Sequence, residues 1–145
     1  MADQDLPDFA QENLYLQTHQ FMLKRLEALQ NEVRTYKLWE YGVSHQRLVV
    51  AIDFLKGRPR PSGHKGYFEY YFGCFGLDYL KLPTVWTSTG LQLATREVCE
   101  KVAIDLGIYK TVEEVSEHCL LFYQEQENIQ ILCGRAGIMN QMPSF

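Results

Sequence analysis

Four cysteines and four histidines have the widest chemical range in this sequence, because thiolates and imidazoles serve as nucleophiles and metal ligands. Structural zinc sites use ligands paired at short spacing, and no such pair occurs here. His118 and Cys119 are adjacent, so on a helix they would diverge by about 100°. We therefore predict no metal site and no cofactor, and interpret the thiols as small apolar core residues. The cysteines stand at 74, 99, 119 and 133, and the histidines at 19, 45, 64 and 118.

Cys74 is the strongest candidate nucleophile, because glycines flank it in the stretch FGCFG and His64 lies ten residues upstream. A reactive cysteine needs a lowered thiol pKa and a base that a third group orients. The sequence gives no sign of either. The phosphate-binding loop, the dinucleotide fingerprint, the nucleophile elbow and the zinc-protease motif are absent as well. We predict a protein without catalytic residues, which is not an enzyme.

A basic, proline-broken loop at residues 57–66 runs directly into a block of aromatic residues. Cations beside exposed rings suit single-stranded nucleic acid, a nucleotide or an acidic peptide. The competing interpretation is a charged surface loop that leads into core aromatics such as Phe68 and Phe72, because so many rings are hard to expose in a soluble protein. The candidate ligand- or partner-binding residues are Arg58, Arg60, His64, Lys65, Tyr67, Tyr70 and Tyr71.

An apolar stripe near the N-terminus predicts a long helix over residues 9–41. This segment has no proline or glycine, and its apolar residues recur at alternating spacings of four and three, as in a coiled coil. Such a helix would be about 50 Å long, more than the about 30–40 Å diameter expected of the domain. We expect it to project or to pack on another chain; internal packing is the alternative. The predicted interface is Met22, Leu26, Leu29, Val33 and Tyr36.

The rest of the chain predicts three more helices and one or two short strands. The run LVVAIDFL at 48–55 is apolar nearly all round and ends before Gly57, which favours a buried helix over the alternative of a strand. Capping boxes at Thr89 and Thr111 predict two further helix starts. The expected helices cover residues 44–56, 89–106 and 111–126. One expected strand ends near residue 75, and the other covers residues 128–133.

Length and composition point to one mainly α domain, residues 1–145, of about four helices. The net charge of −4 lacks the basic footprint that bulk attraction to nucleic acid or to an anionic membrane requires. No secretory signal precedes the first predicted helix, and no apolar run approaches the roughly 20 residues of a membrane helix. With few cysteines, the sequence predicts a cytoplasmic protein with reduced thiols.

Together these features predict a non-enzymatic protein-interaction module: an adaptor, assembly factor, small inhibitor or structural subunit. It would act through the long N-terminal helix and an aromatic-rich surface, and its partner would be another protein or a second copy of itself. The alternative is nucleic-acid or nucleotide binding through the 58–71 patch. Salt dependence separates the two, because phosphate contacts weaken steeply with added salt.

Overall fold

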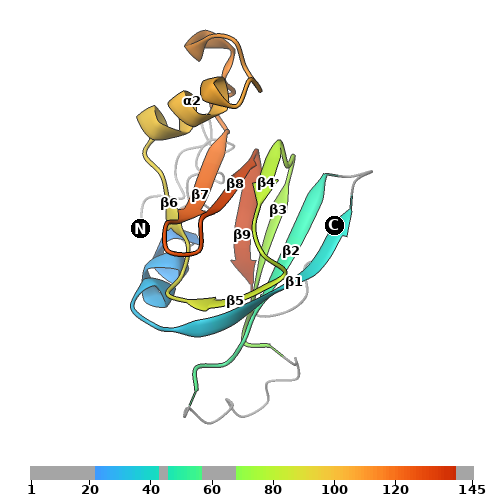
Figure 1. Ribbon diagram of the computed structural model, residues 1–145, viewed down its shortest axis with the longest axis vertical. Helices are drawn as coiled ribbons and strands as arrows, with labels where there is room; N and C mark the ends of the chain where they lie inside the picture. The colour runs from blue at the N-terminus through green and yellow to red at the C-terminus, as the bar shows by residue number, and fades with distance from the viewer. Residues whose placement is uncertain (1–21, 43–45, 57–67, 140–145) are drawn as a thin grey trace, which may run out of the picture.

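The computed structural model describes residues 22–42, 46–56 and 68–139, and in these ranges the protein consists mainly of β-strands (Figure 1). The strands form two antiparallel sheets, one of five strands and one of four, which enclose a common hydrophobic core. The prediction of a mainly α fold is therefore wrong.

Sheet A has the strand order β5-β1-β2-β3-β9, and sheet B has the order β4-β8-β7-β6. Helical structure in the described ranges is confined to residues 22–30, to α2 (Arg96–Asp105) and to the 3₁₀ turn η3 (Val112–Glu114). The strands are β1 (Arg34–Gly42), β2 (Arg47–Ile52), β3 (Tyr70–Phe75), β4 (Tyr79–Lys81), β5 (Val85–Ser88), β6 (Gln92–Leu93), β7 (Leu120–Gln124), β8 (Ile129–Cys133) and β9 (Arg135–Met139).

A corner built on two glycines joins the sheets. The chain passes from β3 to β4 through Gly76 and from β8 to β9 through Gly134, while β3 pairs with β9 in sheet A and β4 pairs with β8 in sheet B. The amide of Gly134 donates to the carbonyls of Phe75 and Gly76, both at 3.1 Å. Gly76 has φ +60°, a conformation that favours glycine because it has no Cβ. The β3–β9 ladder of sheet A and the β4–β8 ladder of sheet B thus meet at this corner.

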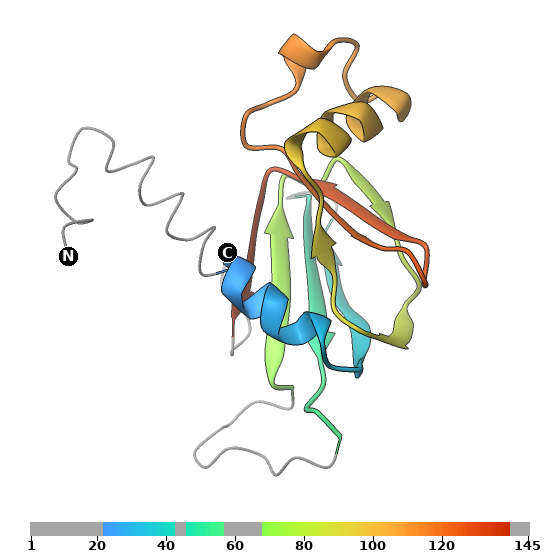
Figure 2. The ribbon, with the colours of Figure 1, turned by 90° about the vertical axis from the view of Figure 1, so that its left-hand side faces the viewer.

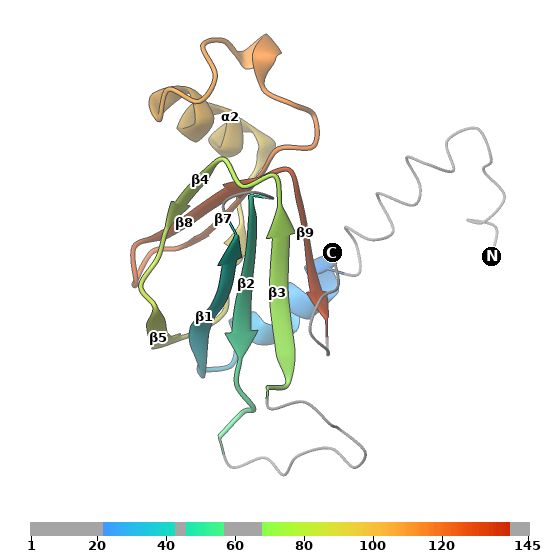
Figure 3. The same cartoon turned by 90° about the vertical axis from the view of Figure 1, so that its right-hand side faces the viewer.

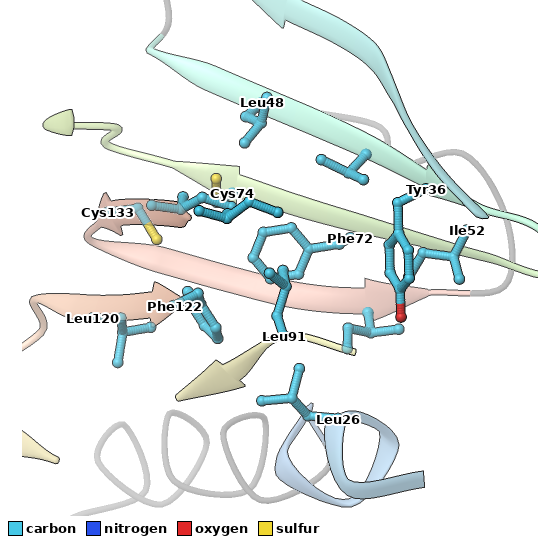
Figure 4. Packing of buried hydrophobic residues seen from close by; sticks show 14 of the residues in the cluster. Leu26, Tyr36, Leu48, Ile52, Phe72, Cys74, Leu91, Leu120, Phe122 and Cys133 are labelled. Carbon is cyan, nitrogen blue, oxygen red and sulfur yellow. The ribbon is translucent and has the colours of Figure 1, made fainter. Parts of the chain in front are cut away.

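The core lies between the inner faces of the sheets, where inward side chains recur with the period of two that strands impose. Phe72 of β3 meets Phe122 of β7 edge to face, with ring centroids 4.9 Å apart (Figure 4). Tyr36 of β1 stacks on Trp86 of β5 at 5.2 Å. These contacts connect strands that lie far apart in the sequence, so the core depends on long-range pairing.

The helix at residues 22–30 packs against this core, as Figure 2 shows. Met22, Leu26 and Leu29 are each 2% exposed and belong to the core cluster, so they pack within the chain rather than on a coiled-coil partner. The rest of the predicted interface is not helical: Val33 precedes β1 and is 57% exposed, and Tyr36 is an inward residue of β1. The prediction of a helix to residue 41 is wrong, and its part before residue 22 lies outside the described residues.

Two other predicted helices are also strands. Residues 48–52 of the expected buried helix belong to β2, whose β-branched residues Val49, Val50 and Ile52 are at most 1% exposed. The expected helix over 111–126 is the short turn η3 followed by β7. The capping box at Thr111 and Glu114 does form, but it opens a single 3₁₀ turn.

Three local predictions agree better with the structure. The strand predicted to end near residue 75 is β3, which ends at Phe75. The strand predicted at 128–133 is β8. The helix predicted over 89–106 exists as α2, but it begins at Arg96 behind the cap Thr95, whose side chain accepts from the amide of Val98, and not behind Thr89. Residues between Thr89 and Thr95 instead form β6, which adds an edge strand to sheet B.

Candidate binding surface

The predicted basic and aromatic patch falls only partly within the described residues. Arg58, Arg60, His64, Lys65 and Tyr67 lie outside them. Tyr70 is partly buried against the core, with the Arg34 guanidinium 5.5 Å from its ring centroid. Tyr71 faces the opposite side of sheet A and is 6% exposed. The two described tyrosines therefore do not share one surface. Phe68 and Phe72 are buried, as the core interpretation predicted.

The outer face of sheet A, which points away from sheet B, carries a second and smaller apolar cluster. Val49 and Ala51 of β2 lie on this face, yet both are fully buried because Phe68 and Tyr71 pack with them. An outward strand residue is usually solvated when one sheet face is free. Here the rings of Phe68 and Tyr71 cover the outer side of β2 and form part of the outer surface of sheet A.

A β-bulge in β1 places Trp39 and Glu40 together on this face. Leu38 pairs with Val50 and Glu40 pairs with Val49, so Trp39 is an extra residue in the ladder. A bulge of this kind re-aims side chains and strengthens the local twist. Leu38 still packs against the core, while Trp39 meets Phe68 edge to face at 5.0 Å and remains 49% exposed.

Two cations lie against other aromatic rings of this sheet. The Lys37 ammonium lies 5.5 Å from the centroid of Phe68, and the Arg135 guanidinium lies 5.9 Å from that of Phe75. Val85, 55% exposed, pairs with Lys37 across the β1–β5 ladder. We call the surface formed by Lys37, Trp39, Phe68 and Val85 the Trp39 patch.

A buried ion network anchors the segment that carries Phe68. Arg34 is 3% exposed; its Nη1 donates to Glu69 Oε1 at 2.5 Å and to the Asp53 carbonyl at 3.0 Å, and its Nη2 donates to Glu32 Oε1 at 2.7 Å. Burial lowers the pKa of Arg34, but the hydrogen bonds and charges of Glu69 and Glu32 outweigh it and leave the pKa raised. Because Glu69 follows Phe68 directly, this network helps to position the floor of the Trp39 patch.

Cys74, the candidate nucleophile, is fully buried in the core near Cys133 (Figure 4). The pKa of Cys133 is raised, first by its hydrogen bond with Cys74 and then by burial. His64 lies outside the described residues. Within the described ranges, no three or more His, Cys, Asp or Glu side chains gather closely enough to hold a metal ion.

On the other side of the molecule, α2 packs on one end of the outer face of sheet B, where Ala103 lies with Leu121 and Leu132. A half-open cleft of about 320 Å³ lies beside it, lined by residues of α2, β7 and β8 that include Val98, Tyr123 and Gln130. The lining also includes the carboxylate of Glu125, and its other side chains are apolar or uncharged at neutral pH.

Neither described helix has the length and apolar character that a membrane span requires.

Comparison with protein-family models, with curated proteins and with solved structures finds no match to this chain.

Proposed function

We propose that this protein is a non-enzymatic interaction module that binds an acidic segment of another protein on the Trp39 patch. The observation that carries the proposal is Trp39, 49% exposed at a bulge. In Figure 3 the outer face of sheet A is turned to the viewer, and no described helix or strand crosses it. Leaving so large a ring in water is unfavourable, and tryptophan is enriched among the residues that dominate protein interfaces.

The charges of the face indicate the chemistry of the partner. Lys37, Arg47 and Arg135 lie on the outer face of sheet A, in a chain whose net charge is −4. Glu40 carries the one carboxylate among the outward-facing residues in the described strands of sheet A, and it forms an ion pair with Arg47. Complementary charge increases association rates and excludes wrong partners. A partner segment with Asp or Glu beside an aliphatic or aromatic anchor fits this surface.

Tyr41 provides a matched control for Trp39. It lies on the same strand and is 50% exposed, but it pairs with the inward residue Leu48 and so faces the other side of sheet A. Loss of either ring removes a similar exposed aromatic surface. Only the loss of Trp39 alters the proposed binding face.

A library of random short peptides displayed on phage, selected against the full chain, tests the proposal. The selected peptides should be acidic with an apolar anchor. They should bind the wild type and Tyr41→Ala alike, and Trp39→Ala about 30-fold more weakly, the effect of a central interface residue.

Other results would overturn the proposal. Peptides that bind Trp39→Ala as tightly as wild type would place recognition elsewhere. Single-stranded oligonucleotides that bind with a steep salt dependence, lost in Trp39→Ala, would favour the nucleic-acid alternative. Sedimentation velocity that shows a dimer dissociated by Trp39→Ala would make the occupant a second copy of the chain.

A further inference from the structure

Cys99 and Cys119 form a close pair of thiols on the outer side of sheet B. Their sulfur atoms are 3.7 Å apart, and Cys99 Sγ also lies 3.5 Å from the Cys119 carbonyl oxygen. The two residues are 2% and 5% exposed. A disulfide needs sulfur atoms about 2.05 Å apart, so these two must approach each other by about 1.7 Å to bond. The sequence did not suggest this pair, because twenty positions separate its members.

Arg96 fixes the two segments that carry the thiols. Its guanidinium donates to the Ser116 carbonyl at 2.7 Å and to the Val115 carbonyl at 3.1 Å. Arg96 is the first residue of α2, and Cys99 follows one helical turn later. Cys119 immediately precedes β7, and its amide bonds to the Ser116 carbonyl at 3.0 Å. The sulfur atoms are therefore held together by contacts on both sides of the pair.

The two thiols differ in acidity. The pKa of Cys99 is lowered, first by its hydrogen bond with Cys119 and, against the effect of burial, by the charge of Arg96. The position of Cys99 near the start of α2 acts in the same direction. The pKa of Cys119 is raised by the same hydrogen bond and by burial. Because Cys99 lies one turn from the start of α2, we assign it as the nucleophile of the pair and Cys119 as the thiol that resolves its oxidised form.

We propose that Cys99 and Cys119 are a site of reversible oxidation, at which a hydroperoxide converts the two thiols into an intramolecular disulfide. The Cys99 thiolate attacks one peroxide oxygen, the O–O bond breaks, and hydroxide leaves as Cys99 becomes a sulfenic acid. The Cys119 sulfur then attacks the Cys99 sulfur, the S–O bond breaks, and water leaves with the thiol proton. Two thiols and one hydrogen peroxide thus give one disulfide and two waters. A small dithiol reverses the reaction by exchange.

The pair Cys74 and Cys133 is the internal control. Both are fully buried inside the core, whereas Cys99 and Cys119 lie where α2 packs against the outer side of sheet B. The two pairs experience the same oxidant in the same molecule. A difference in their reactivity therefore reports local access and acidity, and not the concentration of oxidant.

The experiment treats the reduced full chain with increasing hydrogen peroxide, alkylates the remaining thiols and maps the peptides by mass spectrometry. The folded protein should lose two thiols first and yield a peptide pair that links Cys99 to Cys119, which dithiothreitol separates. The oxidised form should melt about 6–12 °C higher than the reduced form, the shift expected for closing a loop of this size.

Variants separate the roles of the two thiols. Cys119→Ser should stop at a Cys99 sulfenic acid that dimedone captures, and Cys99→Ser should leave Cys119 unmodified at the same peroxide concentration. Cys133→Ser should form the link as wild type does. First oxidation at Cys74 or Cys133, overoxidation of Cys99 without a link, or thiols that react only in denaturant would each overturn the proposal, and the wild-type peptide map alone can reveal all three.

Discussion

Arg34 and Glu69 form an ion pair inside the molecule, with Nη1 of the arginine 2.5 Å from Oε1 of the glutamate and side chains 1% and 10% exposed. Removal of one member of such a pair leaves a buried charge without compensation. We expect Glu69→Ala to lower the free energy of unfolding by about 3 kcal/mol, measured by urea denaturation with circular dichroism. The remaining contact of Arg34 with Glu32 keeps the loss at the lower end of the usual range.

The pair between Arg47 and Glu40 is the control, since its side chains are 26% and 36% exposed. Glu40→Ala should cost less than about 1 kcal/mol, because solvent screens an exposed pair. Equal losses for the two variants would mean that Glu69 does not contribute as a buried partner of Arg34.

Gly90 and Leu29 meet too closely to admit a side chain at the glycine. A Cβ on Gly90 would lie 2.9 Å from the Leu29 Cβ and 3.0 Å from its backbone carbon. Gly90→Ala should therefore destabilise the protein by about 1–3 kcal/mol through overpacking. Gly134→Ala is the matched control, because a Cβ there meets no atom within 4 Å. A thermal melt in which both variants match wild type would show that residues 22–30 do not pack as described.

The hydroxyl of Tyr36 gives stability a dependence on alkaline pH. It is buried with no hydrogen-bond partner among the described residues, and burial raises its pKa from 10.0 to about 12. The unfolded chain loses this proton near pH 10 and the folded chain near pH 12. The stabilising contribution is therefore complete below pH 10 and is lost as the pH rises to 12, by about 3 kcal/mol.

Tyr36→Phe isolates this effect. At pH 7 it should change stability by less than about 1 kcal/mol, because the hydroxyl it removes has no partner there. Between pH 10 and 12 it should lose less stability than wild type in urea titrations, while Tyr71 and Tyr109, whose pKa values burial also raises, act equally in both proteins. Parallel pH profiles would refute the assignment to Tyr36.

Two aromatic substitutions should separate the binding face from the core. Phe72 is 1% exposed and packs on Phe122, so Phe72→Ala should cost about 3–5 kcal/mol. Trp39 is half exposed, so Trp39→Ala should cost much less, about 1 kcal/mol. Similar denaturation midpoints for the two variants would place Trp39 in the core and remove it from the proposed surface.

The sequence predicted the local apolar contacts of the first helix but not where that helix ends. Met22, Leu26 and Leu29 satisfy a helical period and are buried. Tyr36 lies seven positions after Leu29 and extends the heptad, yet it is buried as an alternate residue of β1. The β-branched and aromatic residues of RTYKLWEYG were the available signal for a strand. No glycine or proline between Gln30 and Gly42 marked the point at which the helical period gives way to the strand period.

The candidate surface was harder to predict, because three-dimensional pairing creates it. The bulge that keeps Glu40 on the same face as Trp39 and turns Tyr41 inward depends on the register between β1 and β2, which sequence periodicity does not contain. Likewise, β2 is buried on both faces only because Phe68 and Tyr71 fold over its outer side. That continuous burial gave it the all-round apolar pattern that we interpreted as a buried helix.

The indole N–H resonances of the two tryptophans give the most direct test of the proposed binding surface. Trp39 lies in the patch and Trp86 is 4% exposed in the core, so a ¹⁵N-labelled chain reports on both positions at once. Addition of a selected acidic peptide should shift the Trp39 signal in a saturable manner and leave the Trp86 signal in place. Saturable binding that leaves the Trp39 signal unmoved would contradict the assignment of the partner site to the outer face of sheet A.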